Sequence, residues 1–240
     1  MLSSVQSVSG FVLAGGQSSR MGHDKALMEL AGKPLIEHAV AKLKRVCSDV
    51  AISSGNPLLS AYAPLVADLH PGYGPIGGIE AALLGTRHEW NLFIPVDVPF
   101  LPTLYLYAWL QVVQKARPEG MYAMIFAVNG QPQPTVALLH REIRPGISRA
   151  MEQGEHRLFR TFELATRELA EENGFTRATR SFGIFPYWSE LNSSPEHPSE
   201  GPAWWSITEA QRRYNAHWFD NLNTPDEFAE AERRVDALDT

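Results

Sequence analysis

Two glycines and two cations lie close together near the start of the chain. In the stretch GFVLAGGQSSRMGHDK, residues 10–25, a short apolar run ends at Gly15 and Gly16, and Arg20 and Lys25 follow. A glycine-rich turn after a strand directs several backbone N–H groups toward one concave space, and such a space attracts phosphate. These residue types and their spacing therefore predict an anion site at the end of a first strand.

The spacing excludes two common phosphate loops. A Walker A loop needs Gly-Lys-Ser/Thr at its end, but Gly22 is followed by His23. The dinucleotide fingerprint G-x-G-x-x-G also fails, because five residues separate Gly16 from Gly22. The segment is therefore predicted to be a phosphate-binding turn of another kind. The alternative is a strand-to-helix turn that binds no ligand and whose cations are solvated.

A second chemical centre lies in NLFIPVDVPFLP, residues 91–102. Pro95 and Pro99 cannot both donate to a central β-ladder, so the strand should end here and leave Asp97 at the sheet edge. A carboxylate among apolar residues is costly to bury without a partner. Mg²⁺ suits it, because this ion takes one or two carboxylates together with substrate phosphates and water. A turn-capping aspartate is the alternative.

The elements that position these residues begin with a strand–helix–strand unit. Strands are predicted at 11–14 and 49–53, with an amphipathic helix at 35–46 between them. Such units form parallel strands with right-handed crossovers. Ligands of open α/β sheets bind at the carboxyl ends of the strands, where Ser53 and Asn56 are nucleoside contacts or ordinary turn residues.

Strands and helices alternate along the rest of the chain. A short strand at 64–68 ends in Asp68, and Gly74, Gly77 and Gly78 then precede a helical pattern and would let the backbone approach a ligand closely. Later patterns predict strands at 92–94, 122–128 and 136–139 and helices at 104–115, 143–152 and 157–170. The fold class is α/β, a mainly parallel sheet between helices with an antiparallel excursion in the second half.

The segment FDNLNTPDEF, residues 219–228, starts the last predicted helix. Thr224 suits the N-cap and Pro225 the first helical position, and acidic residues follow in the first turn. Helix capping accounts for Thr224 and Pro225 but gives no reason for the two asparagines before them, Asn221 and Asn223. Because their amides can both donate and accept hydrogen bonds, they are candidate contacts to the polar edge of a flat heterocycle or to a phosphate.

Composition narrows the class of protein. Of the 240 residues, 44% are hydrophobic and 20% charged, an ordinary globular balance. The net charge of -6 disfavours general nucleic-acid binding, and the single cysteine, Cys47, excludes an internal disulfide and a multi-cysteine metal site. The sequence has no apolar run of the roughly 18 residues that a membrane span needs, and residues 1–10 do not read as a signal peptide. A cytoplasmic protein that binds neither nucleic acid nor membrane is expected.

Four segments together resemble the molybdenum-cofactor guanylyltransferases, which are nucleotidyltransferases of the GT-A-like fold. These segments are LAGGQSSRMGHDK, Gly74 to Gly78, Asp97-Val98-Pro99-Phe100 and the terminal Asn-x-Asn-Thr-Pro-x-Glu. The resemblance implies a single three-layer α/β/α domain over residues 1–240, with a Rossmann-like nucleotide-binding half. It also implies transfer of GMP from GTP to the terminal phosphate of a molybdopterin-type cofactor, with release of pyrophosphate.

The resemblance also assigns roles to individual residues. Asp97 would hold the cofactor Mg²⁺, and Lys25 and Arg20 would complete the catalytic set by offsetting charge on the departing pyrophosphate. The nucleotide and cofactor contacts would be Leu13, Ala14, Gly15, Gly16, Lys25, Ser53, Asp68, Asp97, Asn221 and Asn223. GTP and the molybdopterin-type cofactor are the implied substrates, and cofactor-biosynthesis proteins or molybdoenzyme chaperones are the candidate protein partners.

The region expected to hold the pterin matches the family less well. Gln133 and Pro134 would border its pocket, and Arg157 and Arg160 are either anion contacts or part of a solvated helix face. Residues 189–218 are an insertion without a counterpart in the family, partly a polar, proline-rich loop. Its aromatic part includes Trp204 and Trp205, which would pack or stack on a pterin.

Three alternatives to a guanylyltransferase stay open. Cytidylyltransferases of the same cofactor pathway tend to carry Ala-Ala-Gly where this chain has Ala14-Gly15-Gly16, and the missing Cβ at Gly15 would leave room for the larger purine. A non-catalytic nucleotide-binding protein of this fold would not need both Lys25 and Asp97. A sugar-phosphate nucleotidyltransferase usually has additional domains.

Overall fold

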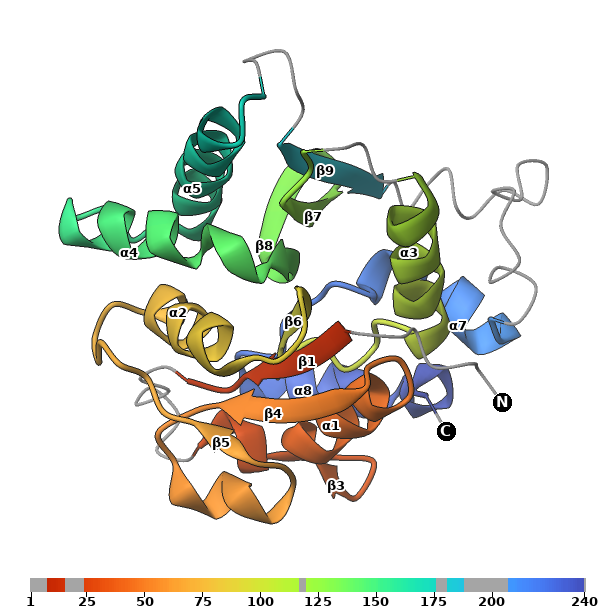
Figure 1. The fold of residues 1–240 in the computed structure, drawn as a ribbon. Coiled ribbons are helices and arrows are strands. Elements are labelled where there is room, and N and C mark those ends of the chain that lie inside the picture. Colours follow the sequence, from red (N-terminus) through yellow and green to blue (C-terminus); the bar gives the residue numbers. More distant parts are fainter. Residues whose placement is uncertain (1–7, 16–23, 117–119, 176–180, 188–206, 240) are drawn as a thin grey trace.

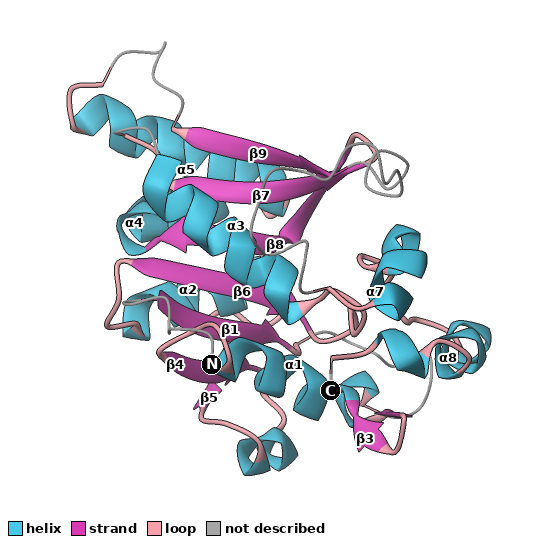
Figure 2. Ribbon diagram, turned by 90° about the vertical axis from the view of Figure 1, so that its right-hand side faces the viewer, coloured by secondary structure: helices cyan, strands magenta, loops and turns pink. Residues whose placement is uncertain are grey.

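The computed structural model describes residues 8–15, 24–116, 120–175, 181–187 and 207–239 (Figure 1). At its centre is a seven-stranded sheet with the order β5-β4-β1-β6-β8-β7-β9. Four neighbouring strands run parallel: β5 (Leu65–Val66), β4 (Asp49–Ser53), β1 (Val8–Leu13) and β6 (Trp90–Pro95). The predicted parallel half of the sheet is confirmed, and Figure 2 shows these strands side by side.

The second half of the sheet contains the antiparallel excursion. β8 (Gln131–His140) runs antiparallel to β6 and to β7 (Ala123–Val128), and β9 (Phe182–Tyr187) pairs in parallel with β7. β8 begins five residues before the predicted start at 136, because Asn129 and Gly130, with φ of 48° and 80°, form a tight two-residue turn. Its prolines are tolerated because β6 pairs only with the later part of β8, Ala137 to His140.

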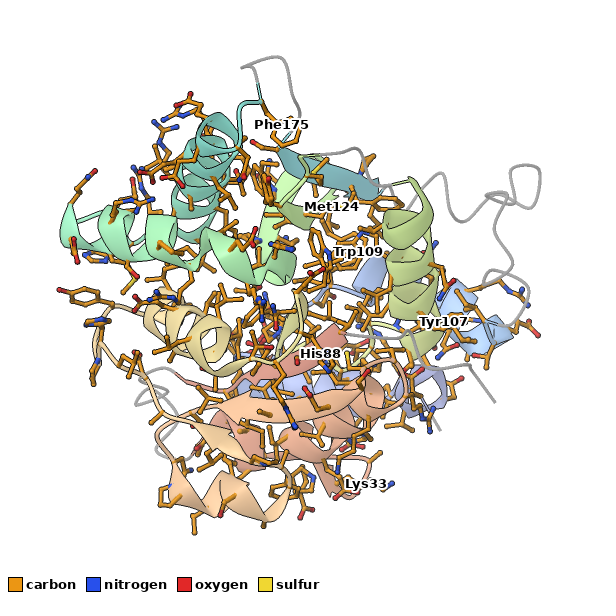
Figure 3. All side chains as sticks on the ribbon, in the orientation of Figure 1. Lys33, His88, Tyr107, Trp109, Met124 and Phe175 are labelled. Atoms are coloured by element: carbon orange, nitrogen blue, oxygen red, sulfur yellow. The ribbon has the colours of Figure 1, made fainter. Side chains whose placement is uncertain are left out.

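Helices cover both faces of the sheet (Figures 1 and 3). One face carries α1 (Leu35–Lys44), α3 (Thr103–Ala116), α7 (Glu209–Arg213) and α8 (Pro225–Glu232), and the other α2 (Pro75–Gly85), α4 (Arg144–Glu152) and α5 (Leu158–Glu172). A hydrophobic core lies on each face of the sheet, and β1 contributes to both. Val8 and Val12 face α1, while Phe11 and Leu13 face α2. The predicted three-layer α/β/α class is confirmed.

Short elements connect the layers. The hairpin of β2 (Glu29–Leu30) and β3 (Lys33–Pro34) leads directly into α1, and Pro34 is the residue before its first turn. The 3₁₀ turns are η1 (Lys25–Leu27), η2 (Pro57–Ala61), η3 (Arg141–Ile143), η5 (Asn215–His217) and η6 (Val235–Ala237). No helix in the described part of the chain combines the length and apolarity needed to cross a bilayer.

The described end of the predicted insertion packs on the core. Within 207–218, Ile207 and Trp218 are buried, and the Trp218 Nε1–H donates to the Gln211 carbonyl at 2.9 Å. The Tyr187 hydroxyl donates to the Asn215 carbonyl at 2.9 Å, which ties this segment to β9. Trp204 and Trp205 lie outside the described residues, so their predicted packing or stacking stays a prediction.

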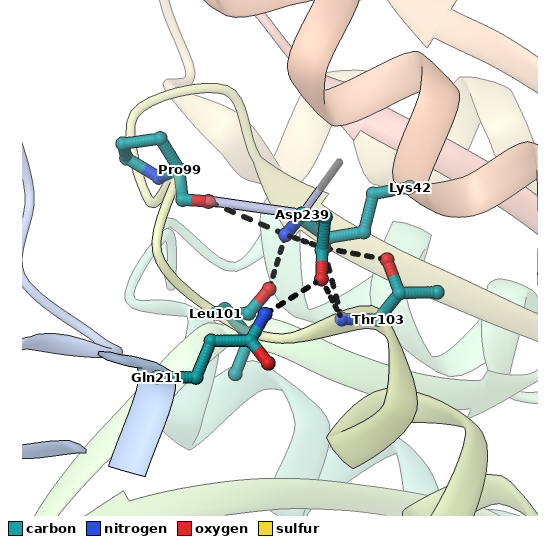
Figure 4. A network of polar contacts seen from close by, with 6 residues as sticks. All are labelled: Lys42, Pro99, Leu101, Thr103, Gln211 and Asp239. Atoms are coloured by element: carbon teal, nitrogen blue, oxygen red, sulfur yellow. Dashed lines mark hydrogen bonds and ion pairs between the residues drawn. The ribbon is translucent and has the colours of Figure 1, made fainter. Parts of the chain in front are cut away.

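A buried lysine connects α1 to the C-terminal segment (Figure 4). Lys42 is 3% exposed and donates to Asp239 Oδ2 at 2.7 Å, to the Pro99 carbonyl at 3.3 Å and to the Leu101 carbonyl. Asp239 also accepts from the backbone and hydroxyl of Thr103 and from the side chain of Gln211. This network holds the turn that follows Asp97.

Candidate active site

The parallel strands bring four predicted residues to one edge of the sheet. Asp68 follows β5, Ser53 ends β4, Gly15 follows β1 and Asp97 follows β6. Because these strands are parallel and adjacent, their carboxyl ends lie in a row. Residues up to 82 positions apart in the sequence therefore share one ligand-binding edge, as expected for an open α/β sheet.

Lys25 reaches this edge from the turn η1. Asp24 caps η1 by accepting from the Ala26 N–H at 2.9 Å, and Ala26 itself is only 1% exposed. The Lys25 ammonium then donates to Asp97 Oδ2 and to Asn223 Oδ1, both at 2.5 Å. The lysine thus joins two predicted site residues from distant parts of the chain.

The position of Asp97 depends on the end of β6 and on the C-terminal segment. β6 ends at Pro95, as the two prolines predicted, and Asp97 follows with 17% of its side chain exposed. Its backbone carbonyl accepts from the Leu222 N–H at 3.0 Å. The segment that contains Asn221 and Asn223 is therefore attached directly to the turn that contains Asp97.

A capping box fixes Asn223. Thr224 caps α8 by accepting from the Glu227 N–H at 3.3 Å, and Glu227 accepts in return from the backbone N–H of Asn223 and, at 2.8 Å, of Thr224. The hydrogen bond from the Asn223 N–H is the main reason that the pKa of Glu227 lies below its usual value. The predicted N-cap at Thr224 and first-turn proline are confirmed.

These residues surround a cavity of about 390 Å³. Its wall includes most of the predicted site together with residues that the sequence did not single out. It is lined by Leu13, Ala14, Gly15, Asp24, Lys25, Ala26, Pro75, Pro95, Val96, Asp97, Thr135, Asn221 and Asn223. The cavity is large enough for part of a nucleotide, and its polar side chains come from four separate segments of the chain.

Ser53 and Asp68 lie on the same edge but outside the residues that line this cavity. Both pack against the start of α2: a Cβ added at Gly77 would collide with the Asp68 carboxylate, and one added at Gly78 with the Ser53 hydroxyl. The close approach predicted for these two glycines therefore involves side chains of the protein itself. Both glycines lie within α2, not before it, while Gly74, with φ of 71°, precedes the helix.

The other predicted residues lie away from the cavity, beside it, or outside the described residues. Gly16 and Arg20 lie outside the described residues, so their phosphate contacts stay predictions. Arg157 and Arg160 form ion pairs with Glu155 and Glu163 at the surface, which agrees with the solvated helix face. Gln133 and Pro134 are strand residues of β8 beside the lining residue Thr135.

Sequence reasoning missed Asp24 and Thr135. Asp24 stands directly before Lys25, and its N-cap preference at a turn was the available signal. Thr135 carried no such signal, because its place on the wall depends on how β8 crosses the sheet. The described residues contain no cluster of three or more His, Cys, Asp or Glu that could hold a metal by itself. Among the described residues of the wall, Asp24 and Asp97 carry carboxylates.

A lysine and an aspartate face one cavity at the carboxyl edge of a mainly parallel sheet, which is where open α/β sheets bind their ligands. The family model described as the MobA-like NTP transferase domain matches residues 10–169. The chain belongs to this family.

Individual relatives agree with this assignment. The chain is 35% identical over 161 residues to the molybdenum cofactor guanylyltransferase of Serratia proteamaculans, covering 64% of this chain and 78% of the relative. It is 33% identical over 176 residues to the protein of that name from Photobacterium profundum, covering 70% and 89%. The crystal structure of molybdopterin-guanine dinucleotide biosynthesis protein A from Archaeoglobus fulgidus superposes with a TM-score of 0.66 at 24% identity, covering 96% of this chain and 100% of that one.

Proposed function

We propose that this protein transfers GMP from GTP to the terminal phosphate of a molybdopterin-type cofactor and releases pyrophosphate. The observation that carries the proposal is the convergence of Lys25, Asp97 and Asn223 on one cavity at the carboxyl edge of the parallel strands. The names of the relatives support the choice of GTP as donor and of the molybdenum cofactor as acceptor.

The residues of the cavity suit this reaction. Nucleotidyl transfer needs phosphates held in line and neutralisation of the charge that develops on the leaving group. Lys25 would neutralise that negative charge, since it lies in the wall and its side chain is 16% exposed. Gly15 would let the triphosphate approach the backbone closely. Asn221 and Asn223 would bind the acceptor with amides that both donate and accept.

The donor set also fits Mg²⁺, which we include in the proposal. Mg²⁺ combines one or two carboxylates with substrate phosphates and water, and the wall offers Asp24 and Asp97. Asp97 would hold the ion, because both oxygens of Asp24 already accept hydrogen bonds from Ala26 and Asn56. When bound, Mg²⁺ supplies positive charge at the phosphate that is attacked.

Gly15 offers a test of the preference for GTP over CTP. Among the described residues, a Cβ added at this position would meet the Ser53 carbonyl oxygen at 3.7 Å, which is ordinary van der Waals contact. Gly15→Ala should therefore fold with an unchanged Tm, while its affinity for GTP falls relative to its affinity for CTP. Calorimetric titration of both nucleotides with Mg²⁺ measures this; equal losses for both would remove the argument that Gly15 makes room for a purine.

The direct test is pyrophosphate release from GTP in the presence of Mg²⁺ and purified molybdenum-pterin cofactor. Asp97→Asn should abolish turnover, and Lys25→Ala should lower the rate on the order of 10²-fold, as does the loss of one preorganised donor. Lys33→Ala, at an exposed lysine on β3, is the matched control and should keep the wild-type rate.

The outcomes of the pyrophosphate assay test the role of Asp97 and distinguish the candidate functions. A near-wild-type rate for Asp97→Asn with an intact circular dichroism spectrum would refute its assigned role. Release of pyrophosphate from CTP but not from GTP would replace the proposal with a cytidylyltransferase. Nucleotide binding without any release would favour a non-catalytic nucleotide-binding protein of the same fold.

A further inference from the structure

Asp24 is a cavity residue to which the proposed reaction gives no direct part. Its Oδ1 accepts from the Ala26 N–H at 2.9 Å, and its Oδ2 accepts from the side-chain amide of Asn56. The carboxylate is therefore held by donors on two different segments, η1 and the turn after β4. Asp24 directly precedes Lys25, so any movement of Asp24 also moves the backbone that carries the lysine.

Asn56 is itself held on three sides. Its Oδ1 accepts from the Leu58 N–H at 3.0 Å and caps η2, and its backbone N–H donates to the Ser54 hydroxyl at 3.1 Å. The remaining group, the side-chain NH₂, is the one that meets Asp24. Because its amide is engaged within the protein, Asn56 is a donor anchored to the end of β4.

We propose that Asp24 and Asn56 are a positioning pair that holds Lys25 across the cavity. Ala26 is buried and anchors one flank of Lys25, and the Asp24–Asn56 hydrogen bond anchors the other. Asn56 follows β4 and Asp97 follows β6, which are the two neighbours of β1. The lysine, anchored on the β4 side, therefore extends past the end of β1 to reach Asp97.

The pair affects nucleotide binding only through Lys25, and in this respect the inference rests on the proposed function. Lys25 is assigned to the phosphates of the leaving group, so loss of the pair should weaken binding of GTP and leave binding of GMP nearly unchanged. A direct role of the Asp24 carboxylate on substrate or metal is the competing explanation. The two explanations differ in whether the negative charge must stay at position 24.

Exchanging the two residues separates these explanations. Asn56→Asp alone places two carboxylates opposite each other and breaks the hydrogen bond. In the double variant Asp24→Asn with Asn56→Asp, an amide at 24 can donate to a carboxylate at 56, while Ala26 and Leu58 keep their acceptors. The exchange restores the contact but moves the charge out of position 24.

Two measurements are made on the wild type, Asn56→Asp and the exchanged variant. The first is the rate at which acetic anhydride labels the Lys25 amine without nucleotide, followed by mass spectrometry. The second is calorimetric binding of GTP and of GMP with Mg²⁺. Asn173→Asp, which adds the same charge at an exposed residue after α5, is the control. Asn56→Ala, which removes the donor without adding charge, replaces Asn56→Asp if the latter does not fold.

The expected result for Asn56→Asp is faster labelling of Lys25 and about tenfold weaker GTP binding, which corresponds to about 1.4 kcal/mol. The exchanged variant should return both quantities to within about twofold of wild type, since a charge-assisted hydrogen bond of the same kind is restored. If the exchanged variant stays as impaired as Asn56→Asp, the positioning role is overturned. If wild-type protein does not bind GTP, the proposed function fails, and the labelling rates still decide the positioning role.

Discussion

Replacing Lys42 with methionine is expected to destabilise the protein strongly. Methionine keeps most of the apolar stem but removes the ammonium, which donates to Asp239 and to the carbonyls of Pro99 and Leu101. The lysine is 3% exposed, and the side chain of Asp239 is 17% exposed. The substitution therefore leaves a largely buried carboxylate without its cation and two carbonyls without a donor.

The magnitude follows from this burial. Removing one partner of a buried ion pair costs about 3–5 kcal/mol, because the remaining charge is left uncompensated. The lower end of that range is expected, since Thr103 and Gln211 still donate to Asp239. For a chain of this size a loss of about 3 kcal/mol lowers Tm by about 6–12 °C.

Urea unfolding measured by circular dichroism tests this prediction. Lys42→Met should lower the urea concentration at the midpoint of unfolding. The slope of the free energy of unfolding against urea concentration should not change, because it reports the surface exposed on unfolding. Lys44→Met on the exposed side of α1 is the control and should stay within about 0.5 kcal/mol of wild type. A loss of less than about 1 kcal/mol for Lys42→Met would refute the reasoning from burial.

The same network predicts a pH dependence. Burial acts to raise the pKa of Asp239, but the charge of Lys42 and the hydrogen bonds from Lys42 and Thr103 outweigh it, so the pKa lies below its usual value. With the folded-state pKa below the unfolded value of about 3.9, the stabilisation is complete above that pH and is lost as the pH falls through the folded-state pKa. The free energy of unfolding of wild type should therefore fall more steeply below about pH 4 than that of Asp239→Asn.

Two further predictions concern packing and capping. Gly146→Ala should cost about 1–3 kcal/mol in the free energy of unfolding, because its Cβ would lie 2.8 Å from a backbone atom of α5. Gly85→Ala is the control and should not destabilise, since a Cβ at Gly85 meets no described atom within 4 Å. Thr224→Ala should lower the free energy of unfolding by about 1 kcal/mol through loss of the N-cap of α8, and an unchanged urea midpoint would show that the capping box is not needed for stability.

Local sequence patterns determined most of the elements of this protein. The alternation and apolar runs at 49–53 and 122–128 predicted strands that the structure places at Asp49–Ser53 and Ala123–Val128. The Thr-Pro-Asp-Glu start of α8 was also predicted from the sequence, because helix caps and first-turn acidic residues interact with groups only three or four positions away. The glycine turn, the lysine and the aspartate between prolines each pointed to phosphate chemistry from residue type alone.

Only the tertiary structure decided which of these groups meet. Lys25 and Asp97 are 72 positions apart and Lys25 and Asn223 are 198 apart, and their contacts depend on strand order and on where the C-terminal segment crosses the sheet edge. The same packing turned the glycines at the start of α2 toward Ser53 and Asp68 and made Asp24 a member of the cavity wall. Periodicity and capping are set by near neighbours in the chain, whereas contacts between distant residues follow from the arrangement of the packed elements, which no local pattern specifies.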